Sequence, residues 1–204
     1  MEKNSSFSYI FISYYFLPNL GGIETSIDSM ALKLKKFKKE SIVITSRAKR
    51  NSNKILPTFY DNGIYKTFRI NTNQKNKIFS LFLINRIIFG LKLRRRVLNL
   101  ALKKSYVCVV RDQFSALFLF GIKNIKILSL PPSICFHESF TNIKVVFLRD
   151  KSNKRYLRIK QLIIMIMQST IGYFLQYVSL MLSDQIRISS YTFKKRLIRI
   201  FPSR

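Results

Sequence analysis

The sequence predicts an α/β protein: a parallel β-sheet with helices on both of its faces. Short runs of apolar and β-branched residues, typical of buried strands, recur along the chain. They alternate with longer segments whose apolar residues repeat every three or four positions, as they do in amphipathic helices. The first strand also passes through a Pro/Asn loop and a glycine pair into a helix, which is the opening unit of a parallel sheet.

That opening unit predicts a binding loop. Residues 9–12 form the strand, and Gly21 and Gly22 precede a helix with an apolar face. The face comprises Ile23, Ile27, Met30, Ala31, Leu34 and Phe37. Glycine has no Cβ, so the backbone can turn tightly and a ligand can come close. The free N–H groups at the start of the helix favour an anion. The same glycines also fit a turn that serves geometry alone.

The next segments continue the alternation. Strands are predicted at residues 41–46 and 64–70, the second after the turn Asp61-Asn62-Gly63. A helix is predicted over residues 78–102. Its expected apolar face is Leu81, Ile84, Ile87, Ile88, Leu91, Val97 and Leu98, and its basic edge is Arg86, Lys92, Arg94, Arg95 and Arg96. Such a helix fits an anionic membrane surface, or a packed helix with a solvated basic face.

Two charged residues follow a buried strand predicted at residues 106–110. Ligands in open α/β sheets bind outside the carboxyl ends of the strands, so Arg111 and Asp112 are candidate cleft residues by position. An arginine there could hold a phosphate or a carboxylate. The alternative is a salt-bridged strand end. A short apolar helix is predicted at residues 115–120.

The last third of the chain contains the single histidine. A strand at residues 125–130 ends in Pro131-Pro132, and His137 follows beside Glu138 as a weak candidate for a catalytic base. Residues 141–148 are a strand or the start of a helix. Residues 161–183 carry no formal charge, and we interpret them as a buried or interfacial helix, with a membrane span as the alternative.

Composition narrows the class of protein. Of 204 residues 48% are hydrophobic, which excludes a disordered chain. Lys and Arg number 37 against 9 Asp and Glu, a net charge of +28 that favours anionic partners. No nucleic-acid-binding motif is visible, so nucleic acid is not a predicted partner. Cys108 and Cys135 have no short spacing and the chain starts without a signal peptide, which predicts a reducing, cytoplasmic location and no zinc site.

Residues 14–24, Tyr-Tyr-Phe-Leu-Pro-Asn-Leu-Gly-Gly-Ile-Glu, resemble the opening of the family 4 (group 1) glycosyltransferases. The aromatic run, the proline, both glycines and the glutamate occur in the family's order. A second resemblance covers residues 180–190, where a helix ends in a small residue and Asp184 and a short strand follows. The resemblance is strong at residues 9–35, weak in the middle of the chain and moderate at residues 175–199.

The resemblance implies a two-domain GT-B enzyme of which this chain supplies one half. Residues 1–190 would be the Rossmann-like, acceptor-side N-terminal domain and residues 191–204 the start of the interdomain linker, with a helix at 191–200. The donor-binding domain is expected to be absent, because no two glutamates lie eight positions apart and no Asp-x-Asp motif occurs. The strand at 125–130 also lacks the histidine that many family members carry at its end.

The function that the resemblance implies is sugar transfer from a nucleotide-sugar to a saccharide or lipid-linked acceptor, in bacterial surface-polysaccharide synthesis. Gly21, Gly22 and Glu24 would lie at the donor phosphates or the acceptor, and Tyr14 and Tyr15 beside the cleft. No cofactor and no metal are expected. The chain would be truncated and inactive alone, acting only with a separate donor-binding chain, in the cytoplasm or on the inner face of the plasma membrane. The alternative is a non-catalytic, basic module of the same fold that binds a membrane surface or a partner.

Overall fold

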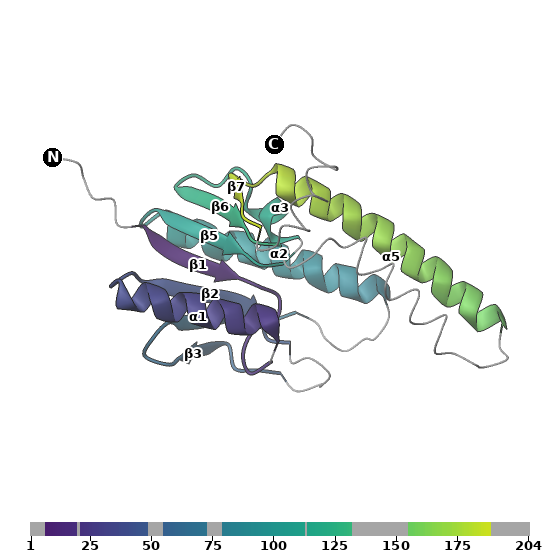
Figure 1. Cartoon of the computed structure of the whole chain (residues 1–204), viewed down its shortest axis with the longest axis horizontal. Coiled ribbons are helices and arrows are strands. Elements are labelled where there is room, and N and C mark those ends of the chain that lie inside the picture. The colour runs from purple at the N-terminus through teal and green to yellow at the C-terminus, as the bar shows by residue number, and fades with distance from the viewer. Residues whose placement is uncertain are drawn as a thin grey trace.

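The computed structural model describes residues 7–19, 21–48, 55–72, 79–112, 114–131 and 155–188. They form a seven-stranded sheet in the order β3-β4-β2-β1-β5-β6-β7 (Figure 1). The strands are β1 (Ser8–Ile12), β2 (Ser41–Ser46), β3 (Phe59–Asp61), β4 (Lys66–Ile70), β5 (Tyr106–Val110), β6 (Ile125–Ser129) and β7 (Gln185–Ile186). All neighbouring strands are parallel except the edge pair of β3 and β4. The predicted α/β class is confirmed, and the arrangement is compatible with a Rossmann-like domain.

The first strand lies at the centre of the sheet. Its partners are β2 on one side and β5 on the other, with Ile12 opposite Ile44 and Val110. Successive side chains of a strand point to opposite faces. Accordingly Ile10 and Ile12 belong to one hydrophobic cluster and Phe11 to another. A central strand buried on both faces explains the unbroken apolar run at this point of the sequence.

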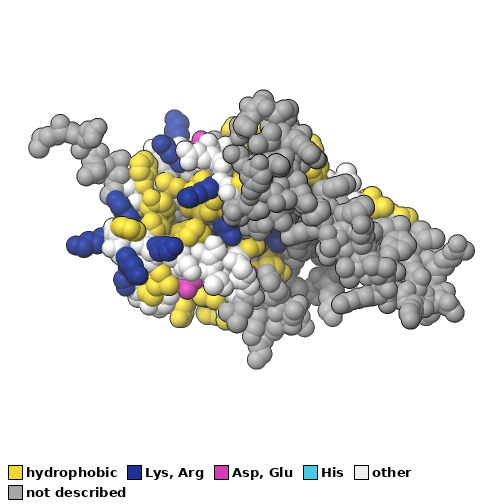
Figure 2. Space-filling model, viewed as in Figure 1, with side chains coloured by type: hydrophobic (Ala, Val, Ile, Leu, Met, Phe, Trp, Pro, Cys, Tyr) yellow, Lys and Arg dark blue, Asp and Glu magenta, His cyan; other side chains and the backbone are white. Residues whose placement is uncertain are grey.

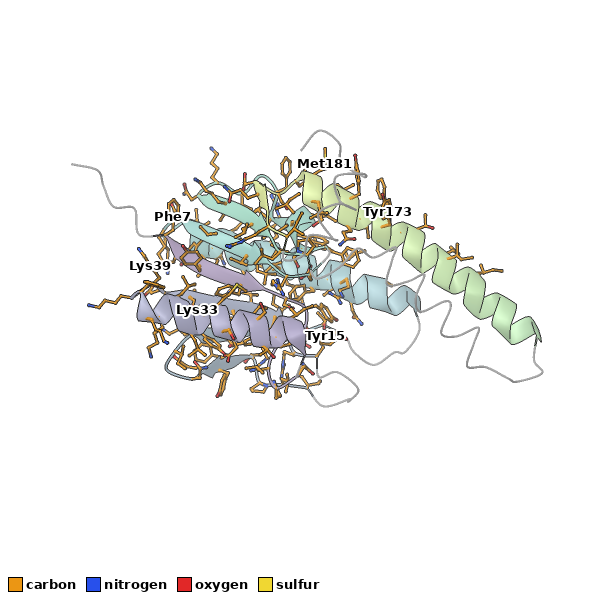
Figure 3. All side chains as sticks on the ribbon, viewed as in Figure 1. Phe7, Tyr15, Lys33, Lys39, Tyr173 and Met181 are labelled. Atoms are coloured by element: carbon orange, nitrogen blue, oxygen red, sulfur yellow. The ribbon has the colours of Figure 1, made fainter. Side chains whose placement is uncertain are left out.

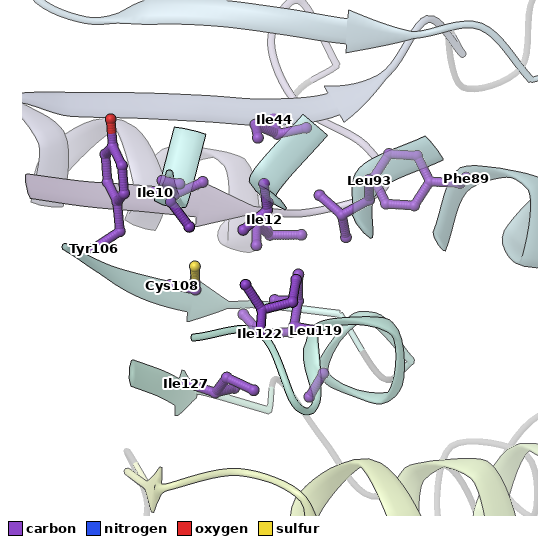
Figure 4. Packing of buried hydrophobic residues seen from close by; sticks show 14 of the residues in the cluster. Ile10, Ile12, Ile44, Phe89, Leu93, Tyr106, Cys108, Leu119, Ile122 and Ile127 are labelled. Carbon is purple, nitrogen blue, oxygen red and sulfur yellow. The ribbon is translucent and has the colours of Figure 1, made fainter. Parts of the chain in front are cut away.

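Helices cover both faces of the sheet. On one face α1 (Gly22–Lys36) packs Ile27 and Ala31 against Phe11 and Val43. On the other face α2 (Phe79–Ala101) and α3 (Ser115–Leu119) build the larger cluster. Phe89 and Leu93 of α2 lie close to Ile12 in that cluster (Figure 4). The fourth described helix, α5 (Arg155–Met181), contacts α3 and extends well beyond the sheet (Figure 1).

The predicted apolar face of the first helix is right at its centre and wrong at its end. Ile27 and Ala31 are fully buried, whereas Phe37 is 75% exposed. The helix ends at Lys36, and Phe37 caps it by donating its N–H to Leu34 O at 3.0 Å. Phe37 therefore lies past the last turn that contacts the sheet.

The predicted helix at residues 78–102 is present as α2. Apart from Val97, the described residues of its predicted apolar face are not on the side that packs against the sheet. The buried row is Asn85, Phe89, Leu93, Val97 and Ala101, one residue in every four. Ile84, Ile87, Leu91 and Leu98, which belong to the predicted apolar face, are exposed, so they do not fit the alternative of a packed helix. Since α2 carries apolar residues on two opposite sides, their period alone could not identify the side that meets the sheet.

The uncharged segment at residues 161–183 lies mostly within α5. Its described polar side chains Gln176 and Ser179 are buried, while the larger apolar ones Ile163, Met167 and Phe174 are exposed. Of the two predicted environments, these exposed apolar residues do not fit the buried one, and the interfacial one stays a prediction. Among the described residues, no helix combines the length and the apolar character needed to cross a membrane.

Two smaller elements complete the comparison. The turn Asp61-Asn62-Gly63 is confirmed: Gly63 adopts φ +74°, and the side chains of Asp61 and Asn62 accept backbone N–H groups within the turn. The edge strand β3, which precedes the turn, was not predicted. The elements predicted at residues 141–148 and 191–200 lie outside the described residues.

Candidate functional site

The order of the strands identifies one edge of the sheet as the place for a ligand. From β1 the chain first adds β2 and β4 on one side, and then returns to add β5, β6 and β7 on the other. Ligands of open α/β sheets bind outside the carboxyl ends of the strands where the order reverses in this way. Here that point lies between β1 and β5. The segment that follows β1 and Arg111, which follows β5, therefore meet at this edge.

The loop after β1 is fixed to the end of β2. The carbonyl oxygen of Tyr14 accepts hydrogen bonds from Ser46 Oγ at 2.6 Å, from Ser46 N at 3.1 Å and from Thr45 Oγ1 at 3.1 Å. A carbonyl that accepts three donors leaves its residue little freedom. The start of the loop therefore takes its position from the neighbouring strand.

Two buried polar side chains hold the rest of the loop. Asn19 donates its Nδ2 to Phe16 O at 2.8 Å and to Ala48 O at 3.1 Å. Arg69, from β4, donates to Leu17 O at 3.0 Å, and burial lowers the pKa of its guanidinium. Asn19 belongs to the predicted Pro/Asn loop, but its hydrogen bonds were not predicted, and Arg69 was not predicted as part of this region. The Pro-Asn pair is a general turn signal, and an arginine in an alternating strand is usually read as solvated.

The glycine pair stands where this loop meets α1. Gly21 is the residue before the helix and has an extended backbone, φ 180° and ψ 170°, which any residue can adopt. Gly22 is the first helical residue, and a Cβ built on it meets no atom within 4 Å. The fold thus does not require a glycine at position 22. The space in front of it is open to a ligand.

The glutamate of the motif lies in the first turn of α1, as predicted. Its side chain is only 1% exposed. A carboxylate at this position is stabilised by the positive end of the helix dipole. Glu24 is therefore a buried residue, although the resemblance places it at the donor phosphates or the acceptor.

The aromatic run divides into buried and accessible rings. Tyr14 and Phe16 are buried, and Tyr14 Oη lies 3.3 Å from Thr72 Oγ1. Burial raises the pKa of Tyr14. Tyr15 is partly exposed and lies near the end of α1 where the helix begins (Figure 3). Of the two tyrosines predicted for the cleft, Tyr14 thus packs in the core and Tyr15 remains accessible.

An arginine from α2 contacts both tyrosines. The guanidinium carbon of Arg86 lies 3.8 Å from the ring centre of Tyr14 and 5.9 Å from that of Tyr15. Such contacts are favourable cation–π interactions. In the sequence Arg86 was assigned to the basic edge of a helix, and only the fold shows that it reaches the loop after β1.

The two charged residues after β5 have different roles. Asp112 Oδ1 accepts the N–H groups of Phe114 and Ser115 at 2.9 and 2.7 Å, and its Oδ2 accepts Ser115 Oγ at 2.5 Å. Asp112 therefore caps the start of α3, and its carboxylate is engaged there. No ion pair between Arg111 and Asp112 is found among the described residues.

Arg111 is the charged side chain best placed for a ligand. Its N–H donates to Ile12 O at 2.8 Å and extends the ladder of β1 and β5 by one residue. Strand alternation then places its side chain on the face of Val109, which is the face that α1 covers. Burial lowers the pKa of the guanidinium, and within the described part of the chain nothing accepts a hydrogen bond from its buried Nε.

Several other observations bear on the site. His137 and Glu138 lie outside the described residues. No group of three metal-ligating side chains occurs among the residues described.

A separate hollow of about 370 Å³ between β3, β4 and α2 includes none of the predicted site residues. It is lined by Thr58, Phe59, Phe68, Arg69, Ile70 and Arg96. The face that carries α1 shows many more basic than acidic side chains (Figure 2).

Comparison with protein-family models and with curated protein sequences finds no match to this chain.

Proposed function

We propose that this chain is the acceptor-side domain of a family-4-type glycosyltransferase, and that its glycine loop binds the diphosphate of a nucleotide-sugar. The observation that carries the proposal is the open space at Gly22. It lies at the positive end of α1, at the carboxyl edge of the central strand, on the α1 face of the sheet, which is the face that strand alternation assigns to Arg111. The resemblance of residues 14–24 to the family adds to this argument from geometry.

In the proposed reaction, the site would stabilise the leaving group, which is the diphosphate. In sugar transfer the bond between the anomeric carbon and the phosphate oxygen breaks, and a bond from that carbon to an acceptor hydroxyl forms. Negative charge then grows on the departing diphosphate, and one of its oxygens takes the proton that the acceptor hydroxyl loses. Fixed N–H dipoles at a helix start and an adjacent guanidinium stabilise such charge without needing to rearrange. Gly21, Gly22 and Arg111 are suited to this task, and the partly exposed ring of Tyr15 can stack on a sugar.

The transfer itself requires a donor-binding domain that faces this edge. The base and sugar of the donor would be held mainly by that second domain. The acceptor would lie on the present domain, beside Tyr15. By itself the domain is expected to bind diphosphate weakly and to transfer nothing.

The binding step is tested with inorganic pyrophosphate and a nucleoside diphosphate as probes, by titration calorimetry on the whole chain. Gly22→Ala places a methyl group in the open space, and we expect it to weaken binding by about tenfold or more, as does Arg111→Gln. Arg95→Gln is the matched control, because it removes the same charge from the outer side of α2. Equal affinities in wild type, Gly22→Ala and Arg111→Gln would overturn the phosphate site.

The transfer step needs a separate assay. The chain is mixed with a donor-binding domain of the same family type, and a panel of nucleotide-sugars is tested for transfer to lipid-linked acceptors. Transfer by the mixture, lost on Gly22→Ala, supports the proposal. Phosphate binding without transfer by any mixture would contradict the enzyme and leave a binding module.

A further inference from the structure

We propose that the outer side of α2 is a docking surface for an anionic phospholipid bilayer. This inference goes beyond the proposed sugar transfer and does not depend on it. The surface consists of an exposed apolar stripe and the basic side chains beside it. The stripe is Ile84, Ile87, Leu91, Leu98 and Leu102, and the basic residues are Lys92, Arg95 and Arg96.

The stripe lies opposite the side of α2 that packs on the sheet. The buried row contains Phe89 and Leu93, and the outer row contains Ile87 and Leu91, each two positions earlier. Two positions on an α-helix turn about 200° around its axis, so each outer residue points directly away from the core. Leu91 is 58% exposed and Leu102 is 84% exposed. A soluble helix normally carries polar residues on that side.

The basic residues border the stripe and interrupt it. Arg95 stands between Leu91 and Leu98 in the outer row, and Lys92 and Arg96 lie along the flank that faces β4. Lys92 donates to Asn71 O, and the guanidinium of Arg96 lies 4.2 Å from the centre of the Phe68 ring. This flank is thus fixed to the fold. Long basic side chains beside an apolar stripe allow a helix to lie in the membrane interface, with its apolar residues at the acyl boundary and its charges at the head groups.

The positive net charge of the chain favours an anionic lipid surface over a second copy of the same chain as the partner of this stripe. A symmetric contact through this stripe would bring Arg95 near Arg95, between chains that each carry +28. Anionic lipid offers the opposite sign, and each basic residue near such a surface strengthens binding about fivefold. The exposed apolar side of α5 lacks this signal, because no charged residue lies between Gln161 and Met181.

The experiment is flotation of the whole chain with vesicles of phosphatidylglycerol and phosphatidylcholine, or of phosphatidylcholine alone. We expect binding to the anionic vesicles only. The double variant Leu91→Gln/Leu98→Gln should reduce it by about tenfold or more, because two leucines leave the acyl boundary. The control Leu32→Gln/Phe37→Gln removes two exposed apolar side chains of α1 and should bind as the wild type does.

A second pair of variants tests the role of charge. Lys92→Gln/Arg95→Gln and Lys33→Gln/Lys36→Gln remove the same net charge, the first beside the stripe and the second from α1. Greater loss in the first pair supports the proposal. The proposal would be overturned by equal loss of vesicle binding in both pairs, or by unchanged binding of Leu91→Gln/Leu98→Gln. It would also be overturned if the wild type formed a dimer without vesicles and Leu91→Gln/Leu98→Gln dissociated that dimer. Circular dichroism of each variant confirms that it is folded.

Discussion

At the residue scale, the loop that follows β1 depends on Asn19. This side chain is buried and donates to carbonyl oxygens on both sides of it, Phe16 O within the loop and Ala48 O beyond β2. We expect Asn19→Ala to lower the free energy of unfolding by about 2–3 kcal/mol, because both carbonyls lose a buried donor. Urea unfolding measures the change. The exposed Asn99→Ala is the control and should cost about 0.5 kcal/mol or less.

An Asn19→Asp variant sharpens this test. It keeps the size of the side chain but replaces the donor with a charge facing two carbonyl oxygens. We therefore expect it to destabilise the protein more than alanine does. If aspartate were tolerated as well as asparagine, the two hydrogen bonds would not be what holds the loop.

A second residue-scale prediction concerns Cys108 in the central strand β5. Burial raises the pKa of its thiol from the ordinary 9.0 to about 12. The unfolded chain therefore releases this proton at a lower pH than the folded chain does. The contribution to stability is complete below about pH 9 and is lost as pH rises toward 12. We expect the free energy of unfolding to fall more steeply with pH over this range in wild type than in Cys108→Ala, and parallel curves would contradict the assignment.

At the element scale, the packing of α2 against α3 gives a matched pair of substitutions. A Cβ added at Gly90 would lie 2.2 Å from the ring of Phe118, whereas one added at Gly22 meets nothing. We expect Gly90→Ala to destabilise by about 1–3 kcal/mol through overpacking. Gly22→Ala should be neutral or stabilise by up to about 1 kcal/mol, because alanine restricts the unfolded chain. Thermal unfolding of both variants measures the change in stability that each substitution causes. Equal changes would contradict the close contact of α2 and α3.

The elements also show how far sequence reasoning reaches. The spacing of apolar residues and the composition placed the central strands and the helices α1 and α2 within a few residues. The buried residues of a helix or strand recur at regular intervals in the sequence, and this leaves a periodic pattern. They did not identify which side of α2 meets the sheet, since Leu93 and Leu91 carry the same side chain. The edge strand β3 was missed because it has only three residues, none of them buried, and because its pairing is decided by its partner strand β4.

The site was predictable to a similar extent. That Gly22 and Arg111 both lie beyond the carboxyl ends of strands followed from the alternation of strands and helices, whereas the strand order that places β1 beside β5 is known only from the fold. The contacts of Arg86, Arg69 and Asn19 with the loop could not be predicted. They join positions 29 to 72 residues apart, and no local pattern distinguishes such a side chain from a solvated one.

At the scale of the whole molecule, the charge imbalance sets the response to salt. A net charge of +28 on 204 residues repels itself most strongly in the compact state. The screening length falls from about 30 Å at 0.01 M to about 10 Å at 0.1 M ionic strength. We therefore expect the urea midpoint to rise as sodium chloride is added over this range. The exposed pair Lys104–Glu40 opposes the trend, but pairs of this kind contribute about 1 kcal/mol or less.

A comparison of anions separates general screening from a specific site. Chloride and phosphate at equal ionic strength should raise the midpoint equally if screening alone acts. A larger effect of phosphate that Gly22→Ala removes would instead identify binding at the start of α1, since a ligand of the native state stabilises it by mass action. A midpoint that falls with added chloride would show that favourable ion pairs outweigh the repulsion. In that case the excess of basic residues would not destabilise the folded chain, and the membrane surface proposed for α2 would have to derive its attraction from Lys92, Arg95 and Arg96 locally rather than from the net charge.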